Sequence, residues 1–300
     1  MSIRPVKQMI DAQPHLEGAG VKLRRGFGFG KTHDFDPFLL FDDFRNDRPA
    51  DYLAGFPWHP HRGIETITYV LAGTVEHGDS LGNRGNLGAG DVQWMTAGSG
   101  IMHQEMPKGD EQGRMHGFQL WANLPASLKM TNPRYQDIAA RDIPTVTEDD
   151  GTSARVICGE FWGQKGPVEG VAADPRYVDI SVPPNRRRRI VVEVTRHAFA
   201  YVFAGSGTFR DASDPQAVRT EATDGSDTIT YDARNHSLVL FDRGDEIVVN
   251  AGPDGIRFLL VSGRPLEEPV AWYGPIVMNT DAELRQTMAD LRAGTFIKHP

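Results

Sequence analysis

Glycine and proline interrupt this chain at short intervals along its whole length. Its 300 residues include 32 glycines and 20 prolines, and both residue types weaken the interior of a helix. Between these breaks lie short runs rich in β-branched and aromatic residues, such as residues 65–71 (ETITYVL) and 177–182 (YVDISV). Runs of this kind favour strands. The pattern predicts an all-β chain of many short strands joined by turns.

The strand-like runs fall into two groups that are separated by a polar, proline-containing stretch at residues 125–144. A chain of 300 residues also exceeds the usual size of a single core,. We therefore expect two β-barrels of the jelly-roll type, residues 1–135 and residues 136–300, with residues 125–144 as the linker region.

One helix is predicted near the end of the sequence. Thr280 and Glu283 have the spacing of a capping box, and Gly294 can terminate the helix,. A helix between these signals presents an apolar stripe of Leu284, Met288 and Leu291,. We expect it to pack on the barrels and group it with residues 136–300.

Two other segments are expected to be connections. Residues 77–91 contain five glycines, and residues 211–226 are rich in Asp, Ser and Thr. The first predicts a turn-rich connection, and the second predicts a hairpin loop.

Charge and cysteine content exclude several classes of protein. The net charge of −8 argues against a broad basic face, so direct binding of nucleic acid is not expected,. Cys158 is the only cysteine, which excludes an intramolecular disulfide and a Cys-rich zinc site,. No apolar run approaches the ~20 residues of a membrane span, and residues 1–23 lack the apolar segment of a signal peptide. We expect an intracellular protein, cytoplasmic or, in a eukaryote, nuclear.

Two pairs of candidate metal ligands have the spacing i, i+2. His59 and His61 precede the strand-like run at residues 65–71, and His103 and Glu105 follow a glycine-containing segment at residues 97–100. In an extended chain, residues i and i+2 point to the same face, so each pair can direct two donors into one cavity. If the two segments face each other in a small barrel, all four donors converge on one ion.

The donor set indicates which ions fit. Three imidazoles and one carboxylate suit Fe(II), Mn(II), Co(II), Ni(II), Cu(II) or Zn(II), whereas Mg²⁺ and Ca²⁺ prefer oxygen ligands. On an octahedral ion, four protein ligands leave two positions for water, dioxygen or a bidentate substrate. Similarity to facial-triad iron sites favours Fe(II). In the second half, His197 and His236 are isolated, and no metal is expected there.

Several segments carry a resemblance to a known family. Residues 56–73 (FPWHPHRGIETITYVLAG), 90–107 (GDVQWMTAGSGIMHQEMP) and 116–125 (HGFQLWANLP) resemble the pirin family of bicupins, as does GPIVMNT from Gly274. The similarity spans nearly the whole chain. It implies two cupin barrels, of which only the first binds metal. The implied ligands are His59, His61, His103 and Glu105.

The general cupin pattern offers an alternative fourth ligand. In that pattern a glutamate follows His-x-His after three or four intervening residues, and here it is Glu65. We expect Gly63 to interrupt the strand between His61 and Glu65. Glu105 lies two residues from His103 and is the preferred ligand.

The resemblance implies two functions of different classes. Pirin relatives are associated with quercetin 2,3-dioxygenase activity, in which Glu105 would be the catalytic base toward a flavonol and dioxygen would be the second substrate. Pirins are also described as transcriptional co-regulators, which implies a non-enzymatic metal- and redox-sensing protein with protein partners.

The residues beside the candidate ligands suggest where an aromatic substrate would bind. Four apolar residues flank the ligands and can either wall a substrate pocket or belong to the core: Phe56, Trp58, Met102 and Met106,. His116 is a further candidate, either as a partner of a metal ligand or in a structural role.

Overall fold

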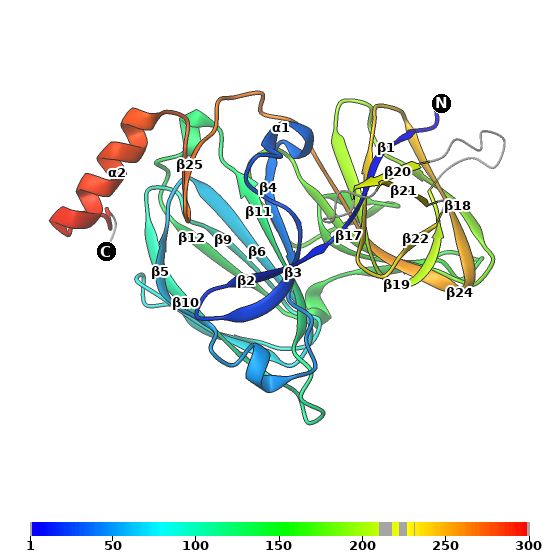
Figure 1. The fold of residues 1–300 in the computed structure, drawn as a ribbon, viewed down its shortest axis with the longest axis horizontal. Coiled ribbons are helices and arrows are strands. Elements are labelled where there is room, and N and C mark those ends of the chain that lie inside the picture. Colours follow the sequence, from blue (N-terminus) through cyan, green and yellow to red (C-terminus); the bar gives the residue numbers. More distant parts are fainter. Residues whose placement is uncertain (1, 210–217, 222–226, 231, 299–300) are drawn as a thin grey trace. The chain divides into compact units, whose positions relative to one another are not determined.

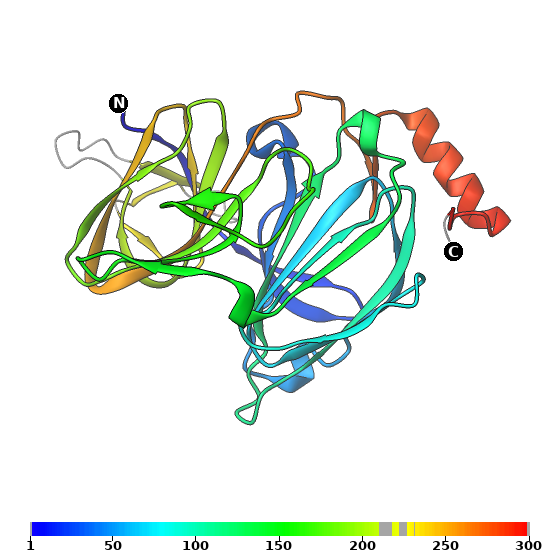
Figure 2. The same cartoon turned by 180° about the vertical axis from the view of Figure 1, so that it is seen from behind.

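The computed structural model describes residues 2–209, 218–221, 227–230 and 232–298. Strands make up most of the chain, and one long helix lies near its C-terminal end (Figures 1 and 2). The predicted all-β class with a C-terminal helix is therefore confirmed.

Contacts divide the chain into two compact units. Unit 1 comprises Met1–Gln13, Ile143–Glu169 and Asp174–Pro265, and unit 2 comprises Pro14–Asp142, Gly170–Ala173 and Leu266–Pro300.

Two sheets form the barrel of unit 2. Their strands are β2 (Gln13–Glu17), β3 (Val21–Phe27), β4 (Phe38–Asp43), β5 (Phe56–His61), β6 (Ile64–Ala72), β7 (Thr74–Asp79), β8 (Arg84–Leu87), β9 (Val92–Thr96), β10 (Ile101–Lys108), β11 (His116–Asn123) and β12 (Arg134–Ile138). The four-stranded sheet has the order β5-β10-β7-β8, and the seven-stranded sheet has the order β12-β9-β6-β11-β4-β3-β2. Thr68 of the larger sheet bonds to Glu105 of the smaller one, so their inner faces enclose a common interior.

Short elements complete unit 2. They are α1 (Thr32–Phe35), η1 (Pro49–Asp51), η2 (Ala126–Leu128), η3 (Ala140–Asp142), β25 (Ala271–Tyr273), β26 (Ile276–Met278) and α2 (Asp281–Ala293). The capping box of α2 is present, because Thr280 Oγ1 accepts from the Glu283 amide and Glu283 Oε2 accepts from the Thr280 amide. Gly294 ends the helix in the left-handed conformation. None of the helices in the described part of the chain is long and apolar enough to cross a membrane.

The apolar stripe of α2 packs within unit 2. Leu284, Met288 and Leu291 contact a buried cluster formed by Ile276, Met278 and Phe296. The helix thus covers β26 and belongs to unit 2, whereas the sequence-based division grouped it with residues 136–300.

Three segments differ from the sequence-based predictions. Residues 77–91 are not only turns, because they contain β8 and the end of β7, which pair with each other antiparallel. Residues 125–144 are not a simple linker, because β12 pairs with β9 and extends the larger sheet of unit 2. Of residues 211–226, Val218–Glu221 form β20 and the others lie outside the described residues.

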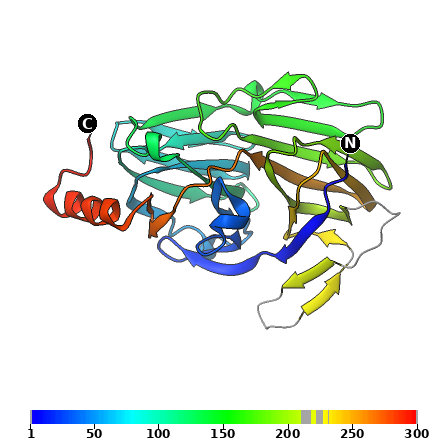
Figure 3. The ribbon, with the colours of Figure 1, turned by 90° about the horizontal axis from the view of Figure 1, so that it is seen from above.

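Unit 1 is built on a single eleven-stranded sheet with the order β13-β14-β17-β24-β19-β23-β1-β20-β21, in which β18 and β22 pair off this path. Its β20 and β21 pair antiparallel (yellow in Figure 3). A separate pair is formed by β15 and β16. The bounds are β1 (Val6–Asp11), β13 (Thr145–Thr147), β14 (Ser153–Cys158), β15 (Glu160–Phe161), β16 (Gln164–Lys165), β17 (Arg176–Val182), β18 (Arg187–Val191), β19 (His197–Thr208), β20 (Val218–Glu221), β21 (Asp227–Thr230), β22 (Ala233–Arg234), β23 (Ser237–Phe241) and β24 (Glu246–Gly263).

Each end of the chain belongs to the unit whose main part lies far from it in the sequence. β1 pairs antiparallel with β23, which places the N-terminal strand in unit 1. Leu266–Pro300, with α2, groups with unit 2. A division at residue 135 is linear and falls inside β12, so it assigns β1 and α2 to the opposite units.

Candidate metal centre and cavity

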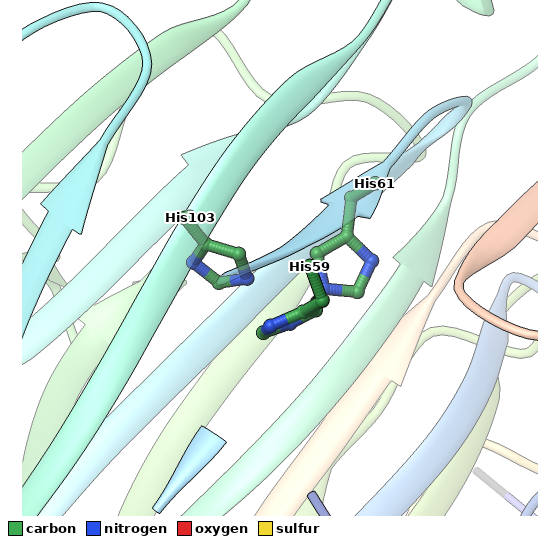
Figure 4. A group of neighbouring side chains, drawn as sticks. All are labelled: His59, His61 and His103. Carbon is green, nitrogen blue, oxygen red and sulfur yellow. The ribbon is translucent and has the colours of Figure 1, made fainter. Parts of the chain in front are cut away.

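Three histidines of unit 2 converge in the barrel interior. His59 and His61 lie on β5, and His103 lies on the neighbouring antiparallel strand β10, directly opposite His59. Figure 4 shows the three rings turned toward one another. One ring nitrogen from each residue lies within 4.8 Å of the other two. The i, i+2 spacing on β5 and the register with β10 together produce this cluster.

Backbone carbonyls set the tautomers of the two β5 histidines. Nδ1 of His59 lies 2.8 Å from the Pro57 carbonyl oxygen, and Nδ1 of His61 lies 3.1 Å from that of Pro275. A carbonyl can only accept, so each Nδ1 carries a proton and each Nε2 presents a lone pair. The sequence did not predict that the Pro275 carbonyl contacts His61, although Pro275 lies in the pirin-like GPIVMNT segment.

The spacing of the nitrogens fits a shared cation. The two Nε2 atoms are 3.1 Å apart, and two lone pairs at this distance repel each other. With metal–nitrogen bonds of about 2.1 Å, neighbouring ligands of an octahedral ion are about 3.0 Å apart. A cation between the rings therefore satisfies both nitrogens at the separation that the structure has.

The surroundings of His103 independently fit a metal ligand. Its side chain is fully buried, and among the described residues neither of its ring nitrogens has a hydrogen-bond partner. Leaving a buried polar atom unsatisfied costs roughly 1–3 kcal/mol. Burial, together with the neighbouring imidazoles, holds the pKa values of His103 and His61 well below the usual value for histidine. Both rings are therefore neutral at pH 7, which is the form that binds metal.

Glu105 lies beside this cluster but is not part of it. It follows His103 by two residues on β10, and a register irregularity relative to β5 separates the two. Its side chain is buried, and its Oε1 accepts a hydrogen bond of 3.0 Å from Thr68 Oγ1. Glu105 and the two β5 histidines line one cavity. Its assignment as the fourth ligand remains a prediction.

Glu65 occupies a different environment. It lies on β6 three residues before Thr68, and alternation along a strand places the two on opposite faces,. Thr68 lines the cavity and Glu65 does not. Glu65 instead accepts a hydrogen bond of 2.7 Å from Thr96 Oγ1, and burial raises its pKa to about 7.

Arg62, next to His61, anchors the ligand strand to the C-terminal segment. Its buried guanidinium donates to the carbonyls of Ser99 and Phe296 and to the side chains of Thr287 and Asp290, all at 2.7–3.0 Å. It also lies 4.5 Å above the centre of the Phe296 ring. The position of the β5 histidines is thus coupled to α2.

The turn after β5 is equally constrained. Gly63 has a φ of +78°, and a β-carbon there would lie 2.0 Å from the Val277 carbonyl oxygen. Lys129 Nζ donates to the carbonyl oxygens of both residues and to Asn123 Oδ1. Only glycine fits this close approach, which explains the break between β5 and β6 that the sequence predicted.

The cavity beside the histidines has a volume of about 720 Å³. Its wall is mainly apolar and includes several aromatic rings, and Trp121 packs edge-on against His61 with ring centres 5.0 Å apart. The aromatic lining residues are Phe29, Phe44, Tyr52, Phe56, Trp121, Trp272 and Tyr273.

Of the four flanking residues, which could wall a pocket or belong to the core, only Phe56 lines this cavity. Trp58, Met102 and Met106 are direct neighbours of ligand positions on their strands and project from the other face. Phe56 lies beyond the register irregularity, where it pairs with Glu105 and shares its face,. Trp58 is 52% exposed. The Nε2 of His116 pairs with Asp47 and not with a candidate metal ligand.

A buried polar pair that the sequence pattern did not predict lies beside His103. His77 lies on β7, and its ring centre is 5.5 Å from that of His103. Its Nε2 lies 3.2 Å from Asp79 Oδ2, and Asp79 also accepts from Asn83. His77 and Asp79 have the same i, i+2 spacing as the two pairs of candidate ligands. The glycines around them led to the prediction of a turn-rich connection instead of a strand.

Comparisons with known proteins agree over nearly the whole chain. The Pirin family model matches residues 20–122, and the model of the pirin C-terminal cupin domain matches residues 177–297. A "Pirin-like protein" of Caulobacter vibrioides is 44% identical, with 99% of this chain and all of the relative covered. A Pseudomonas aeruginosa protein named "Putative quercetin 2,3-dioxygenase" is 40% identical, with 97% of each covered. The crystal structure of quercetin 2,3-dioxygenase from Acinetobacter baumannii has a TM-score of 0.85 at 30% identity, covering 98% of this chain and 99% of its own.

Proposed function

Because this chain belongs to the pirin family of bicupins, we propose that it is a mononuclear-metal dioxygenase that opens flavonols such as quercetin with dioxygen. The observation that carries the proposal is the convergence of three imidazoles beside an aromatic-lined cavity, which His59 and His61 line. The names of two similar proteins support the same substrate class.

The residues that would hold the metal are His59 and His61, through Nε2, with His103 and, as the fourth ligand, Glu105. This donor set favours Fe(II) and also suits Mn(II), Co(II), Ni(II), Cu(II) and Zn(II). When bound, such an ion supplies Lewis acidity toward the 3-hydroxyl and carbonyl oxygens of a flavonol, and redox chemistry with dioxygen.

The role of Glu105 is that of a general base. Its carboxylate accepts the proton of the flavonol 3-hydroxyl, and Thr68 holds the carboxylate in place through its hydrogen bond to Oε1,. The ring carbon that bears the hydroxyl then leaves as carbon monoxide with its own oxygen. Both atoms of dioxygen remain in the ring-opened ester, so the atoms balance.

The aromatic wall orients the substrate. Flat rings such as Trp121 and Phe56 provide apolar contact area for a flat polycyclic ligand and exclude water from it,. His61 is fixed between Trp121 on one side and the Pro275 carbonyl on the other, so it presents Nε2 without reorganisation,.

The test is reconstitution followed by turnover. Metal-free protein is loaded anaerobically with Fe(II), and in parallel with each of the other ions, and quercetin and oxygen are then added. Loss of flavonol absorbance over many turnovers, with release of one carbon monoxide per flavonol, is expected. His103→Gln should abolish both metal retention and turnover, whereas the matched control His116→Gln should retain both.

A protein that binds metal but turns over no flavonol with any first-row ion would contradict the proposal. That result would favour the other function implied by the family, a metal- and redox-sensing protein that acts through protein partners.

A further inference from the structure

A row of polar side chains crosses the larger sheet of unit 2 at one register. Arg25 of β3 pairs with Asp42 of β4, Asp42 pairs with Gln119 of β11, and Gln119 pairs with Thr68 of β6. Directly paired residues of antiparallel strands project from the same face. All four line the cavity, whose remaining wall is largely aromatic and aliphatic.

One end of the row, Thr68, contacts Glu105 of the smaller sheet, and the other end, Arg25, lies in a charged cluster. Thr68 Oγ1 lies 3.0 Å from Glu105 Oε1 and 2.7 Å from Gln119 Oε1. At the far end, Arg25 donates to both carboxylate oxygens of Asp42, at 2.8 and 2.7 Å. Because strands are spaced by about 4.8 Å, Asp42 lies roughly 10 Å from Thr68.

Gln119 in the middle of the row has spare hydrogen-bonding capacity. Thr68 is its only side-chain partner among the described residues, through one end of the amide. The nitrogen and oxygen of a glutamine amide can exchange places in a structure, but in either orientation one end is left without a protein partner. That end belongs to a residue that lines the cavity, so it is available to a bound ligand.

The charges along the row select the kind of ligand group. Among the described residues, the cavity is lined by three carboxylates, those of Glu17, Asp42 and Glu105, and by one guanidinium, that of Arg25. Arg25 is already bonded to Asp42 and Glu17. An anionic ligand group would be repelled here, whereas a neutral hydroxyl can donate to a carboxylate and exchange hydrogen bonds with an amide.

We propose that Gln119 and Asp42 form a second recognition point, which binds the hydroxyl groups on the pendant ring of a polyhydroxylated aromatic ligand. The reacting ring lies at Glu105 and the histidines, and the pendant ring reaches along the row. The inference rests on the proposed function, because it takes a flavonol as the ligand. In this arrangement Gln119 makes the protein bind flavonols with a hydroxylated pendant ring more tightly than flavonols with an unsubstituted one.

The test compares two flavonols in the absence of oxygen. Quercetin carries two hydroxyls on its pendant ring, and galangin carries none there. Calorimetric titration of the Fe(II)-loaded protein under argon measures the affinity of each without turnover. Gln119→Met keeps the length of the side chain and removes its polar end. We expect it to weaken quercetin about tenfold and to change galangin less than twofold.

Two further measurements distinguish a selective loss of quercetin affinity from a general loss of ligand binding. Thr68→Val acts at the end shared by both ligands and should weaken galangin as well as quercetin, unlike Gln119→Met. A flavonol with a carboxylate on the pendant ring should bind the wild type less tightly than galangin. Metal content and thermal unfolding of each variant verify that the barrel is intact.

Equal weakening of quercetin and galangin by Gln119→Met, or no weakening of either, would overturn the second recognition point and leave the proposed reaction standing. Failure of the wild type to bind either flavonol would overturn the proposed function, and this inference with it.

Discussion

The carbonyl oxygen of Pro275 lies 3.1 Å from Nδ1 of His61, although the two residues are 214 positions apart in the chain. This contact fixes the proton on Nδ1 and leaves Nε2 free for an ion. A segment close to the end of the chain is therefore part of the candidate metal centre. Its attachment to the barrel should matter for metal binding as well as for stability.

Metal should stabilise the folded protein through the histidine cluster. A ligand present at 100 times its dissociation constant adds about 2.7 kcal/mol to the free energy of unfolding. We expect Ni(II) or Fe(II) to raise the melting temperature of the wild type, because the ion satisfies nitrogens that are otherwise unpaired. His103→Gln should lose this shift. An equal shift in the variant would show that the ion binds elsewhere.

The fourth ligand can be identified by two matched substitutions. Glu105→Gln should lower the bound metal well below one ion per chain, because it removes the anionic donor beside the histidines. Glu65→Gln should retain the ion, since Glu65 does not line the cavity. Metal content measured by mass spectrometry decides between them. Retention in the first variant and loss in the second would reverse the assignment.

Loss of the Arg62 anchor should be strongly destabilising. Arg62→Met removes four hydrogen bonds and leaves the buried carboxylate of Asp290 with Lys298 as its remaining cationic partner. Breaking a buried ion pair from one side costs about 3–5 kcal/mol, and the contact with Lys298 offsets part of this cost. Denaturant unfolding measures this loss, and metal affinity should fall in parallel because Arg62 adjoins His61.

The control for this experiment is Arg114→Met. Arg114 forms an ion pair with Asp110, but its side chain is 46% exposed. A surface pair of this kind contributes less than about 1 kcal/mol. A similar loss of stability in both variants would contradict the role given to Arg62.

Glu65 should make stability depend on pH. Burial raises its pKa in the folded protein from 4.5 to about 7, so between these values the folded state binds more protons than the unfolded state,. The contribution is complete below pH 4.5 and is lost as the pH rises through about 7, with a size of up to about 3 kcal/mol. Glu65→Gln, which stays neutral, should remove this component. Denaturant unfolding of both proteins from pH 4.5 to 8 measures the difference, and parallel curves would contradict it.

Local signals in the sequence account for much of the fold. The capping box of Thr280 and Glu283 and the glycine at 294 predicted α2, because these contacts join residues a few positions apart. The i, i+2 spacing of His59 and His61 predicted a shared face, since alternation is a property of any strand. These features depend only on neighbouring residues.

The tertiary structure alone determined which residues of distant segments contact these local features. Pairing of β5 with β10 brings His103 opposite His59, and the return of the C-terminal segment brings Pro275 to His61. The polar row from Arg25 to Thr68 exists only because four strands share one register. Such contacts join residues far apart in the sequence, and strand register is set by the packing of the whole barrel, which no local pattern contains.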